Sequence, residues 1–299
     1  MRRWPNYPAH QQFIDPARRA PQVWRLVLGL VLAFAVYLLC NQSLFRWIDT
    51  IMGDSGAALH LDLMSGRTPL AMYVLLFSFA FMILGVAVAA RMVHRRGPLT
   101  LVGPWGLAVR QFGSVLWMLV TINLAVWLLP PWDWGAPLER NMALGKWLLL
   151  VPFSLAAVLV QVSAEEILFR GYIQQQLAAR FRSPLIWMIL PAALFGIGHY
   201  LPDSAGPNAA LIALWAVAFG ILMADLTARA GTIGPAIAVH FVNNVTAIML
   251  VSLPDDLSGL ALYLSPFSMA DTEAMRAWLP VDFALMIVGW LGARLALRR

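Results

Sequence analysis

The sequence predicts an all-α membrane protein, a polytopic bundle of about eight transmembrane helices. Hydrophobic residues make up 61% of the 299 residues, charged residues only 12%, and the mean hydropathy is +0.73. A water-soluble domain averages about 25% charged residues, so this deficit argues against the soluble classes. The apolar residues also form long continuous runs, whereas the strands of a membrane β-barrel alternate apolar and polar positions. Composition and runs together indicate membrane-spanning helices.

Eight candidate spans follow one another along the chain. A helix needs about 20 apolar residues to cross a hydrocarbon core of about 30 Å. Seven stretches without Asp, Glu, Lys or Arg approach or exceed this length, at residues 26–45, 68–90, 111–132, 147–164, 183–202, 204–224 and 230–254. An eighth, at about 279–297, includes Asp282 and Arg294 near its ends, where charged side chains can reach the membrane interface.

The distribution of basic residues predicts the orientation of these spans. If the N-terminus is inside and the chain crosses eight times, 16 of the 21 Lys and Arg residues fall in inside segments and 5 in outside segments. Short cytoplasmic loops carry such an excess. We therefore expect an integral protein of the bacterial inner (cell) membrane with both termini in the cytoplasm. Basic loops facing anionic lipid of the bilayer explain the net charge of +6, so no nucleic-acid partner is expected.

The chain is predicted to form a single membrane domain at residues 23–299, preceded by a cytoplasmic N-terminal tail at residues 1–22. The tail is polar and Arg-rich, and we expect it to be disordered or to lie on the surface. Cys40 is the only cysteine, which excludes an internal disulfide. The predicted organisation is therefore one helical domain with a short tail.

Two adjacent glutamates, Glu165 and Glu166, lie at the end of the fourth apolar run, where a charge costs several kcal/mol unless it is paired or hydrated. Glu166 and Arg170 are four residues apart, so they share one helical face and can pair. Glu165 points about 100° away from Glu166. The pattern predicts a structural pair, Glu166 with Arg170, beside a carboxylate that is free for chemistry. The alternative is a salt-bridged helix end at the cytoplasmic interface.

His199 is expected at the same depth in the membrane as Glu165. If the turn between the fourth and fifth spans is near Arg182, both residues are 17 positions from it. Antiparallel helices of equal rise then bring them to one level. Gly196 and Gly198 precede the histidine and allow close approach of another helix. A lone histidine here is more often a hydrogen-bonded core residue, so the shared depth is what favours a common site.

His240 and Asn244 are also four residues apart, on the seventh span, and project from one face. Two such groups can polarise a carbonyl oxygen, or they can contribute to a metal site. His240 is only about six residues from Gly234-Pro235, which makes it shallower than Glu165. Either that turn is sunk into the membrane or the hairpin at residues 172–182 protrudes into the cytosol, and both arrangements stay open.

Three motifs, taken together, resemble those of a membrane protease family. They are Glu165-Glu166-x-x-x-Arg170, Phe195-x-x-x-His199 and His240-x-x-x-Asn244. Their order and the gaps between them are similar to the CPBP family of intramembrane endopeptidases, which includes type II CAAX prenyl proteases and bacteriocin-processing, Abi-like proteins. Each motif alone is a weak signal, and the combination is a strong one. The resemblance covers a catalytic core at about residues 140–252.

The resemblance implies hydrolysis of a peptide bond in a membrane-associated peptide or protein substrate. By motif position, the catalytic residues would be Glu165, His199, His240 and Asn244. The first two would activate a water molecule, and the last two would stabilise the tetrahedral oxyanion. The pair Glu166 and Arg170 would give structural support. A carboxylate in an apolar site suits the role of general base near neutral pH.

No cofactor is favoured for this chemistry, and a divalent metal such as zinc is the alternative. Glu165, His199 and His240 could bind zinc with a water molecule in the fourth position. The His-Glu-x-x-His motif of many zinc proteases is absent, and the two histidines lie on different predicted helices. Glutamate-dependent catalysis without a metal is therefore preferred.

The main alternative is a membrane protein that is not an enzyme, either a proton-coupled transporter or a bacteriocin-immunity protein. Asp225 and Arg229, four residues apart near the inside face, would suit a proton path, although such a pair more often tethers a helix. Asn244 distinguishes the two hypotheses. A proton relay does not need a non-titrating amide beside His240, whereas an oxyanion hole does.

Overall fold

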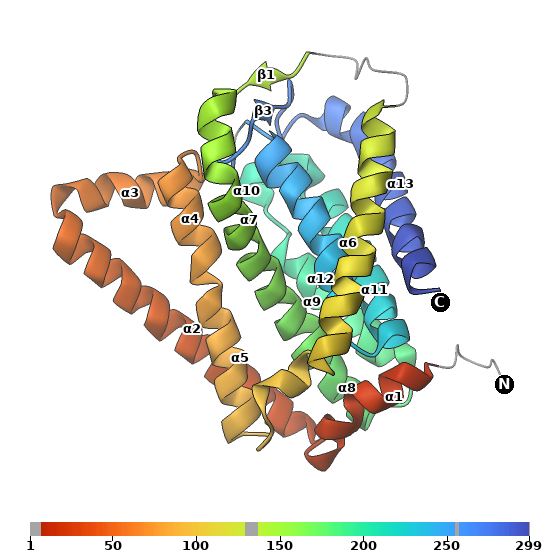
Figure 1. The fold of residues 1–299 in the computed structure, drawn as a ribbon. Helices are drawn as coiled ribbons and strands as arrows, with labels where there is room; N and C mark the ends of the chain where they lie inside the picture. Colours follow the sequence, from red (N-terminus) through yellow and green to blue (C-terminus); the bar gives the residue numbers. More distant parts are fainter. Residues whose placement is uncertain (1–6, 129–136, 255–256, 299) are drawn as a thin grey trace.

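The computed structural model describes residues 7–128, 137–254 and 257–298, and within them the chain is a bundle of helices (Figure 1). The predicted all-α polytopic fold is confirmed. Six helical segments among these residues are long and apolar enough to cross a membrane. They are α2 (Val23–Met52), α4 with α5 (Pro69–Ser78 and Ala80–Met92), α6 (Trp105–Leu128), α7 to α8 (Leu144–Glu166 and Gln175–Arg180), α10 to α11 (Pro202–Ala205 and Ala209–Ala230) and α13 (Thr272–Leu297).

The fifth and seventh predicted spans are shorter apolar helices, Leu185–Gly198 and Gly234–Leu250. The first consists of η4 (Leu185–Ile189) and α9 (Leu190–Gly198), and the second of α12 (Gly234–Asn244) and η6 (Val245–Leu250). Both have fewer than the about 20 residues that a full span needs. All eight predicted segments are therefore helical, and six of them reach spanning length in the described part of the chain.

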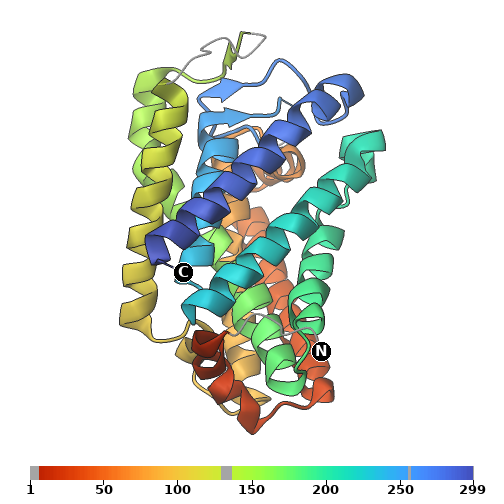
Figure 2. The ribbon, with the colours of Figure 1, turned by 90° about the vertical axis from the view of Figure 1, so that its right-hand side faces the viewer.

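The helices divide into two groups (Figure 1). Helices α2, α3 (Asp54–Ser65) and α4 form the sides of a triangle at one flank, and the remaining long helices form a bundle beside it. Within that bundle α12 packs against α6, α7 and α11, which places it at the centre. Figure 2 shows α11 and α13, which also contact one another, crossing this bundle at a tilt. The central position of α12 brings its polar residues next to α7.

The turn before α12 is sunk into the protein, below its surface. Thr232, Ile233, Gly234 and Pro235 are all buried. A Cβ on Gly234 would lie 2.2 Å from the carbonyl oxygen of Ala108, so only glycine permits this approach of the turn to α6. The seventh segment therefore begins deep in the bundle, and this depth compensates for its short length.

Of the two arrangements expected for the N-terminal tail, disordered or lying on the surface, the described part from Tyr7 onward has the second: it is folded and lies against the outside of the bundle. It forms α1 (Pro8–Ile14) and η1 (Asp15–Arg19). Phe13 and Ile14 pack against Ile233 of the sunken turn, so α1 covers this turn from outside. The hydrophobic contact explains why a tail of polar composition is ordered, because its few apolar residues are buried together.

Asp225 connects the tail to two helices. It accepts hydrogen bonds from Tyr7 Oη at 2.8 Å, Arg229 Nε at 2.7 Å and Trp290 Nε1 at 3.1 Å. These donors come from the chain before α1, from α11 and from α13. The expected pair of Asp225 with Arg229 is therefore formed, and its surroundings are those of a structural tether.

A small sheet joins the loops at the end of the bundle opposite α1 (Figure 1). It contains β1 (Glu139–Arg140), β3 (Tyr263–Leu264) and β2 (Val251–Ser252), in this order. Strand β3 pairs antiparallel with β1 and parallel with β2. The sheet links the chain before α7 with the chain after η6, and so it fixes the relative position of two segments that carry the candidate site.

Helices α9 and α11 approach closely because both present glycine at their contact. A Cβ on Gly196 would lie 2.4 Å from a methyl group of Val217, and one on Gly220 would lie 2.8 Å from Cβ of Ala192. The expectation of a close helix contact at Gly196 is confirmed, whereas Gly198 has open space around its Cα. This contact brings Phe195 and Gly220 to the same place in the bundle.

Acidification is expected to destabilise the protein, because two histidines outside the spans are buried. Burial and the nearby Arg18 lower the pKa of His10 to about 3, and burial with the nearby Arg96 lowers the pKa of His94 to about 4. The unfolded chain binds these protons near pH 6.5, so the unfolded state gains stability progressively below that pH. Each pH unit within the window costs about 1.4 kcal/mol per histidine.

Thermal unfolding in detergent at neutral and mildly acidic pH measures this effect. The His10→Phe variant keeps an aromatic ring against Trp187, whose ring centre is 4.5 Å from that of His10. It should lose less stability on acidification than the unmodified protein. Equal losses in the two proteins would show that His10 does not contribute to the acid sensitivity.

Candidate active site

The two glutamates stand where α7 changes its helical geometry. Glu165 and Glu166 end α7, and the chain continues as a π-helix, η3 (Ile167–Gln174), before α8. Another π-helix, η6, begins directly after Asn244. Short π-helical segments are rare and occur often at functional sites, because the wider turn changes the direction of the side chains that follow. Both changes of geometry adjoin residues that the motifs single out.

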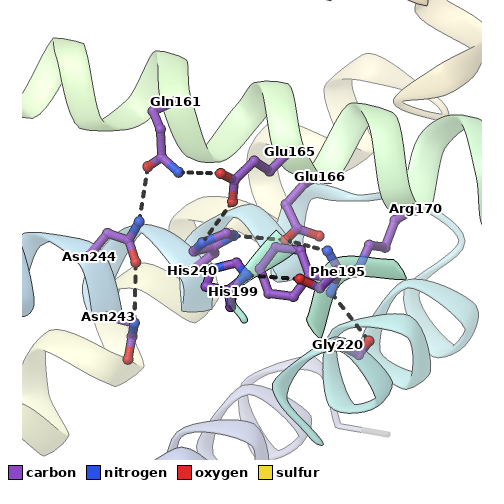
Figure 3. A network of polar contacts seen from close by, with 10 residues as sticks. All are labelled: Gln161, Glu165, Glu166, Arg170, Phe195, His199, Gly220, His240, Asn243 and Asn244. Atoms are coloured by element: carbon purple, nitrogen blue, oxygen red, sulfur yellow. Dashed lines mark hydrogen bonds and ion pairs between the residues drawn. The ribbon is translucent and has the colours of Figure 1, made fainter. Parts of the chain in front are cut away.

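Glu166 is the centre of a buried ion-paired group (Figure 3). Its Oε1 accepts hydrogen bonds from Arg170 Nη1 at 3.0 Å and from His240 Nδ1 at 2.9 Å. Arg170 Nη2 donates to the carbonyl oxygen of Gly220 at 3.2 Å. The side chains of Glu166, Arg170 and His240 are 0%, 2% and 5% exposed. The predicted pair of Glu166 with Arg170 is confirmed, and it joins α7, α11 and α12.

Glu165 points away from Arg170 and toward α12. Its Oε1 accepts a hydrogen bond from Gln161 Nε2 at 2.7 Å. Its Oε2 is 3.5 Å from His240 Nε2. The two nitrogens of the His240 ring therefore face the two glutamates, with Nδ1 toward Glu166 and Nε2 toward Glu165. The His240 ring is thus held between the fully buried carboxylate of Glu166 and the partly accessible carboxylate of Glu165.

Asn244 joins the same chain of polar side chains through Gln161. Its Nδ2 donates to Gln161 Oε1 at 2.9 Å, and its Oδ1 accepts from Asn243 Nδ2 at 3.2 Å. The series Glu165, Gln161 and Asn244 is continuous in Figure 3. Gln161 was not among the residues predicted from the sequence. It could have been found there, because it is a polar residue in an apolar run, one helical turn before Glu165.

His199 ends α9, and aromatic contacts connect it to this group. Its Nδ1 donates to the carbonyl oxygen of Phe195 at 2.8 Å, since a carbonyl can only accept. The ring of Phe195 is 4.4 Å from that of His199 and 6.0 Å from that of His240, between ring centres. In the described residues no hydrogen bond or ion pair joins His199 to Glu165. The other ring nitrogen of His199, Nε2, makes no hydrogen bond among the described residues.

Solvent access separates the predicted residues into two sets. The buried set is Glu166, Arg170 and His240. The partly accessible set is Glu165, whose side chain is 13% exposed, His199 and Asn244. The Glu165 side chain is therefore more accessible than that of Glu166, although Oε2 of each carboxylate is buried without a hydrogen-bond partner among the described residues. The separation agrees with the predicted division between a structural carboxylate and a free one.

The residues named as alternative zinc ligands do not form a ligand set in this arrangement. A catalytic zinc site needs three protein ligands at about 2.0–2.3 Å from the metal. Among the described residues, no group of three or more His, Cys, Asp or Glu side chains is placed to hold a metal ion. Glu165 and His240 approach one another, whereas His199 turns its Nδ1 toward Phe195.

Comparison with known proteins identifies the segment that carries the site. Residues 147–246 match the family described as type II CAAX prenyl endopeptidase Rce1-like. The matched segment contains all three motifs, from Glu165 to Asn244. The resemblance to this protease family is therefore confirmed for the segment. An Rce1-like segment implies a membrane peptide hydrolase that acts on a membrane-associated substrate.

A relative extends the likeness beyond the motifs. The uncharacterized protein YyaK of Bacillus subtilis (strain 168) is 26% identical over 254 residues, which cover 83% of this chain and 84% of that protein. No solved structure gives a significant match.

Removal of the Arg170 guanidinium is expected to damage folding. Arg170→Ala leaves the buried Glu166 carboxylate without its arginine partner, and breaking a buried pair costs about 3–5 kcal/mol. Arg170→Lys keeps a charge but cannot reproduce the fork that reaches both Glu166 and Gly220, so its loss should be smaller. Expression level and thermal stability in detergent measure both variants. A fully stable Arg170→Ala protein without activity would instead indicate a role in catalysis or substrate binding.

Proposed function

We propose that this chain, which carries an Rce1-like segment at residues 147–246, is an intramembrane endopeptidase that hydrolyses its substrate with water activated by Glu165. One observation carries the proposal. The two adjacent glutamates have different surroundings. Glu166 is buried and binds Arg170 and His240, whereas Glu165 lies at the partly accessible edge of this group. A carboxylate at the open edge of a fixed, buried ion-paired group is suited to general-base catalysis, because its position is set and it is not itself paired with an arginine.

Glu165 and His199 are the proposed water-activating residues. Glu165 accepts a proton from water as the water oxygen attacks the carbonyl carbon of the scissile peptide bond. His199 holds the same water by accepting a hydrogen bond at Nε2, because its Nδ1–H is donated to Phe195. When the C–N bond breaks, Glu165 returns the proton to the leaving amine. Two acceptors on one water orient its lone pair toward the substrate.

His240 and Asn244 are the proposed oxyanion donors. His240 lies between the two carboxylates, with Nδ1 toward Glu166 and Nε2 toward Glu165. In the proposed transition state Nδ1–H is held by Glu166, and Nε2–H donates to the negative oxygen that develops next to Glu165. Asn244 has a second amide hydrogen besides the one donated to Gln161. Donors fixed before the reaction stabilise the transition state without reorganisation.

Gln161 is proposed to position both the general base, Glu165, and the oxyanion donor Asn244. Its amide donates to Glu165 and accepts from Asn244, so it sets the distance between the base and an oxyanion donor.

The substrate class is a membrane-associated peptide or protein that enters from the lipid or from the cytoplasmic side. Both termini of the protein are proposed to lie in the cytoplasm of a bacterial cell, as the distribution of basic residues indicates.

Substitutions at the site are expected to separate activity from stability. The assay uses purified protein in detergent with a panel of hydrophobic peptides that includes a prenylated CAAX peptide. Glu165→Gln and His199→Ala should abolish cleavage with melting temperatures near that of the unmodified protein. Asn244→Ala should retain a residual rate, lowered about 100- to 1000-fold in kcat. Glu273→Gln, the same exchange at an exposed position of α13, is the matched control and should keep full activity.

A Glu165→Gln protein that cleaves the same peptides at an unchanged rate would contradict the role of Glu165. Loss of stability in Glu165→Gln equal to that of Arg170→Ala would show that Glu165 belongs to the structural group instead.

Metal dependence is tested by treatment with a strong chelator. The proposed mechanism predicts that the stripped enzyme keeps its activity, because Glu165 activates the water without help from a metal ion. Activity that disappears on stripping and returns with zinc would overturn this mechanism, while the assignment as a protease would stand. Metal analysis of the purified protein before and after stripping is the control.

A further inference from the structure

A cavity lies at the end of the bundle that carries α1, apart from the candidate active site. Its volume is about 450 Å³, within the range of about 300–1,000 Å³ for small-molecule sites. Residues of α1 and η1 form one wall. The turn between the fourth and fifth helical segments, at residues 178–184, forms the other wall together with Trp187 of η4. None of the catalytic candidates is among its lining residues.

The lining of this cavity is basic. Arg18, Arg180 and Arg182 line it, and the described lining residues include no Asp or Glu. Arg18 is 3.6 Å from Asp15 and also donates to Gln11. Among the described residues no ion pair is formed by Arg180 or Arg182. Arg180 and Arg182 therefore provide positive charge that no carboxylate of the described residues balances, and Arg18, paired with Asp15, adds a third guanidinium to the lining.

His10 adds a buried hydrogen-bonding group to the cavity wall. The residue is only 1% exposed, and its Nε2 has no hydrogen-bond partner among the described residues. Its ring lies against Trp187, at 4.5 Å between ring centres, which holds it in place. A buried polar atom without a partner is costly, so such atoms generally have an unseen ligand or water. Because burial keeps His10 neutral, it can donate one N–H without adding charge.

We propose that this cavity binds a phosphate group, held by the arginines Arg18, Arg180 and Arg182 and by Nε2–H of His10. Arginine binds phosphate oxygens in a bidentate manner, and its planar group matches their spacing. Two kinds of ligand carry such a phosphate group: an anionic phospholipid, in its phosphodiester headgroup, and free inorganic phosphate. The distribution of basic residues places this end of the protein at the cytoplasmic surface, where both are present.

The bound phosphate would connect two parts of the chain that are distant in sequence. Arg18 follows α1, which covers the sunken turn before α12, and Arg180 with Arg182 lies in the turn that joins the two segments carrying Glu165 and His199. A ligand that binds only the folded state stabilises it in proportion to its saturation. Phosphate binding should therefore raise the melting temperature of the protein.

The test uses the full-length protein in neutral detergent and follows its melting temperature with three additives. They are mixed micelles containing phosphatidylglycerol, mixed micelles containing phosphatidylcholine, and inorganic phosphate compared with chloride at equal ionic strength. The double variant Arg180→Ala/Arg182→Ala removes two of the arginines. Arg91→Ala/Arg95→Ala makes the same change of charge at exposed positions that do not line the cavity.

We expect phosphatidylglycerol, inorganic phosphate or both to raise the melting temperature, and phosphatidylcholine to have a smaller effect. The cavity variant should weaken the apparent affinity at least about tenfold, equal to about 1.4 kcal/mol, while the control variant responds as the unmodified protein does. Stabilisation by lipid alone identifies a headgroup site, and stabilisation by phosphate alone identifies a free-anion site. His10→Phe should reduce the response with the basal melting temperature preserved.

Two results would overturn the proposal. The first is no stabilisation by either phosphate source. The second is an equal loss of response in the cavity variant and in the control variant, because this would indicate attraction to general surface charge. Neither result depends on peptide cleavage, so the site and the protease function are tested separately.

Discussion

The arrangement of the site depends on the burial of one charged group, the carboxylate of Glu166, which has no exposed surface. A buried charge destabilises a protein strongly unless cations and hydrogen-bond donors surround it. The donors to Glu166 come from two segments, with Arg170 on η3 and His240 on α12, and Arg170 also binds the carbonyl of Gly220 on α11. The contacts made to Oε1 of this one carboxylate therefore bring three helices together, and Glu165 lies at the edge of the group.

The packing around this group depends on small residues and on changes of helical geometry. Glycines at 196 and 220 let α9 and α11 approach, so that the rings of Phe195 and Phe219 reach His240. The π-helices after Glu166 and after Asn244 change the direction of the following chain. Polar side chains are thus held by apolar contacts as well as by hydrogen bonds, which limits their movement in the absence of substrate.

The sequence was sufficient for the features that depend on spacing within one helix. The pair of Glu166 with Arg170, and the different direction of Glu165, follow from 3.6 residues per turn. Contacts between helices could not be derived in this way, because spacing does not determine which helix lies opposite. The bond from His240 to Glu166 and the bridge through Gln161 were therefore missed. The burial of the turn at Gly234 could not be derived either, since it depends on packing against α6.

The central claim is that Glu165 activates water for cleavage of membrane-associated peptides. Quantitative mass spectrometry of membrane peptides tests it most directly, in cells that produce either the unmodified protein or Glu165→Gln at equal levels. The account predicts a set of cleavage products that disappears in Glu165→Gln and persists in the Glu273→Gln control, with intact precursors accumulating. Identical peptide patterns in the three strains, at equal amounts of folded protein, would contradict it.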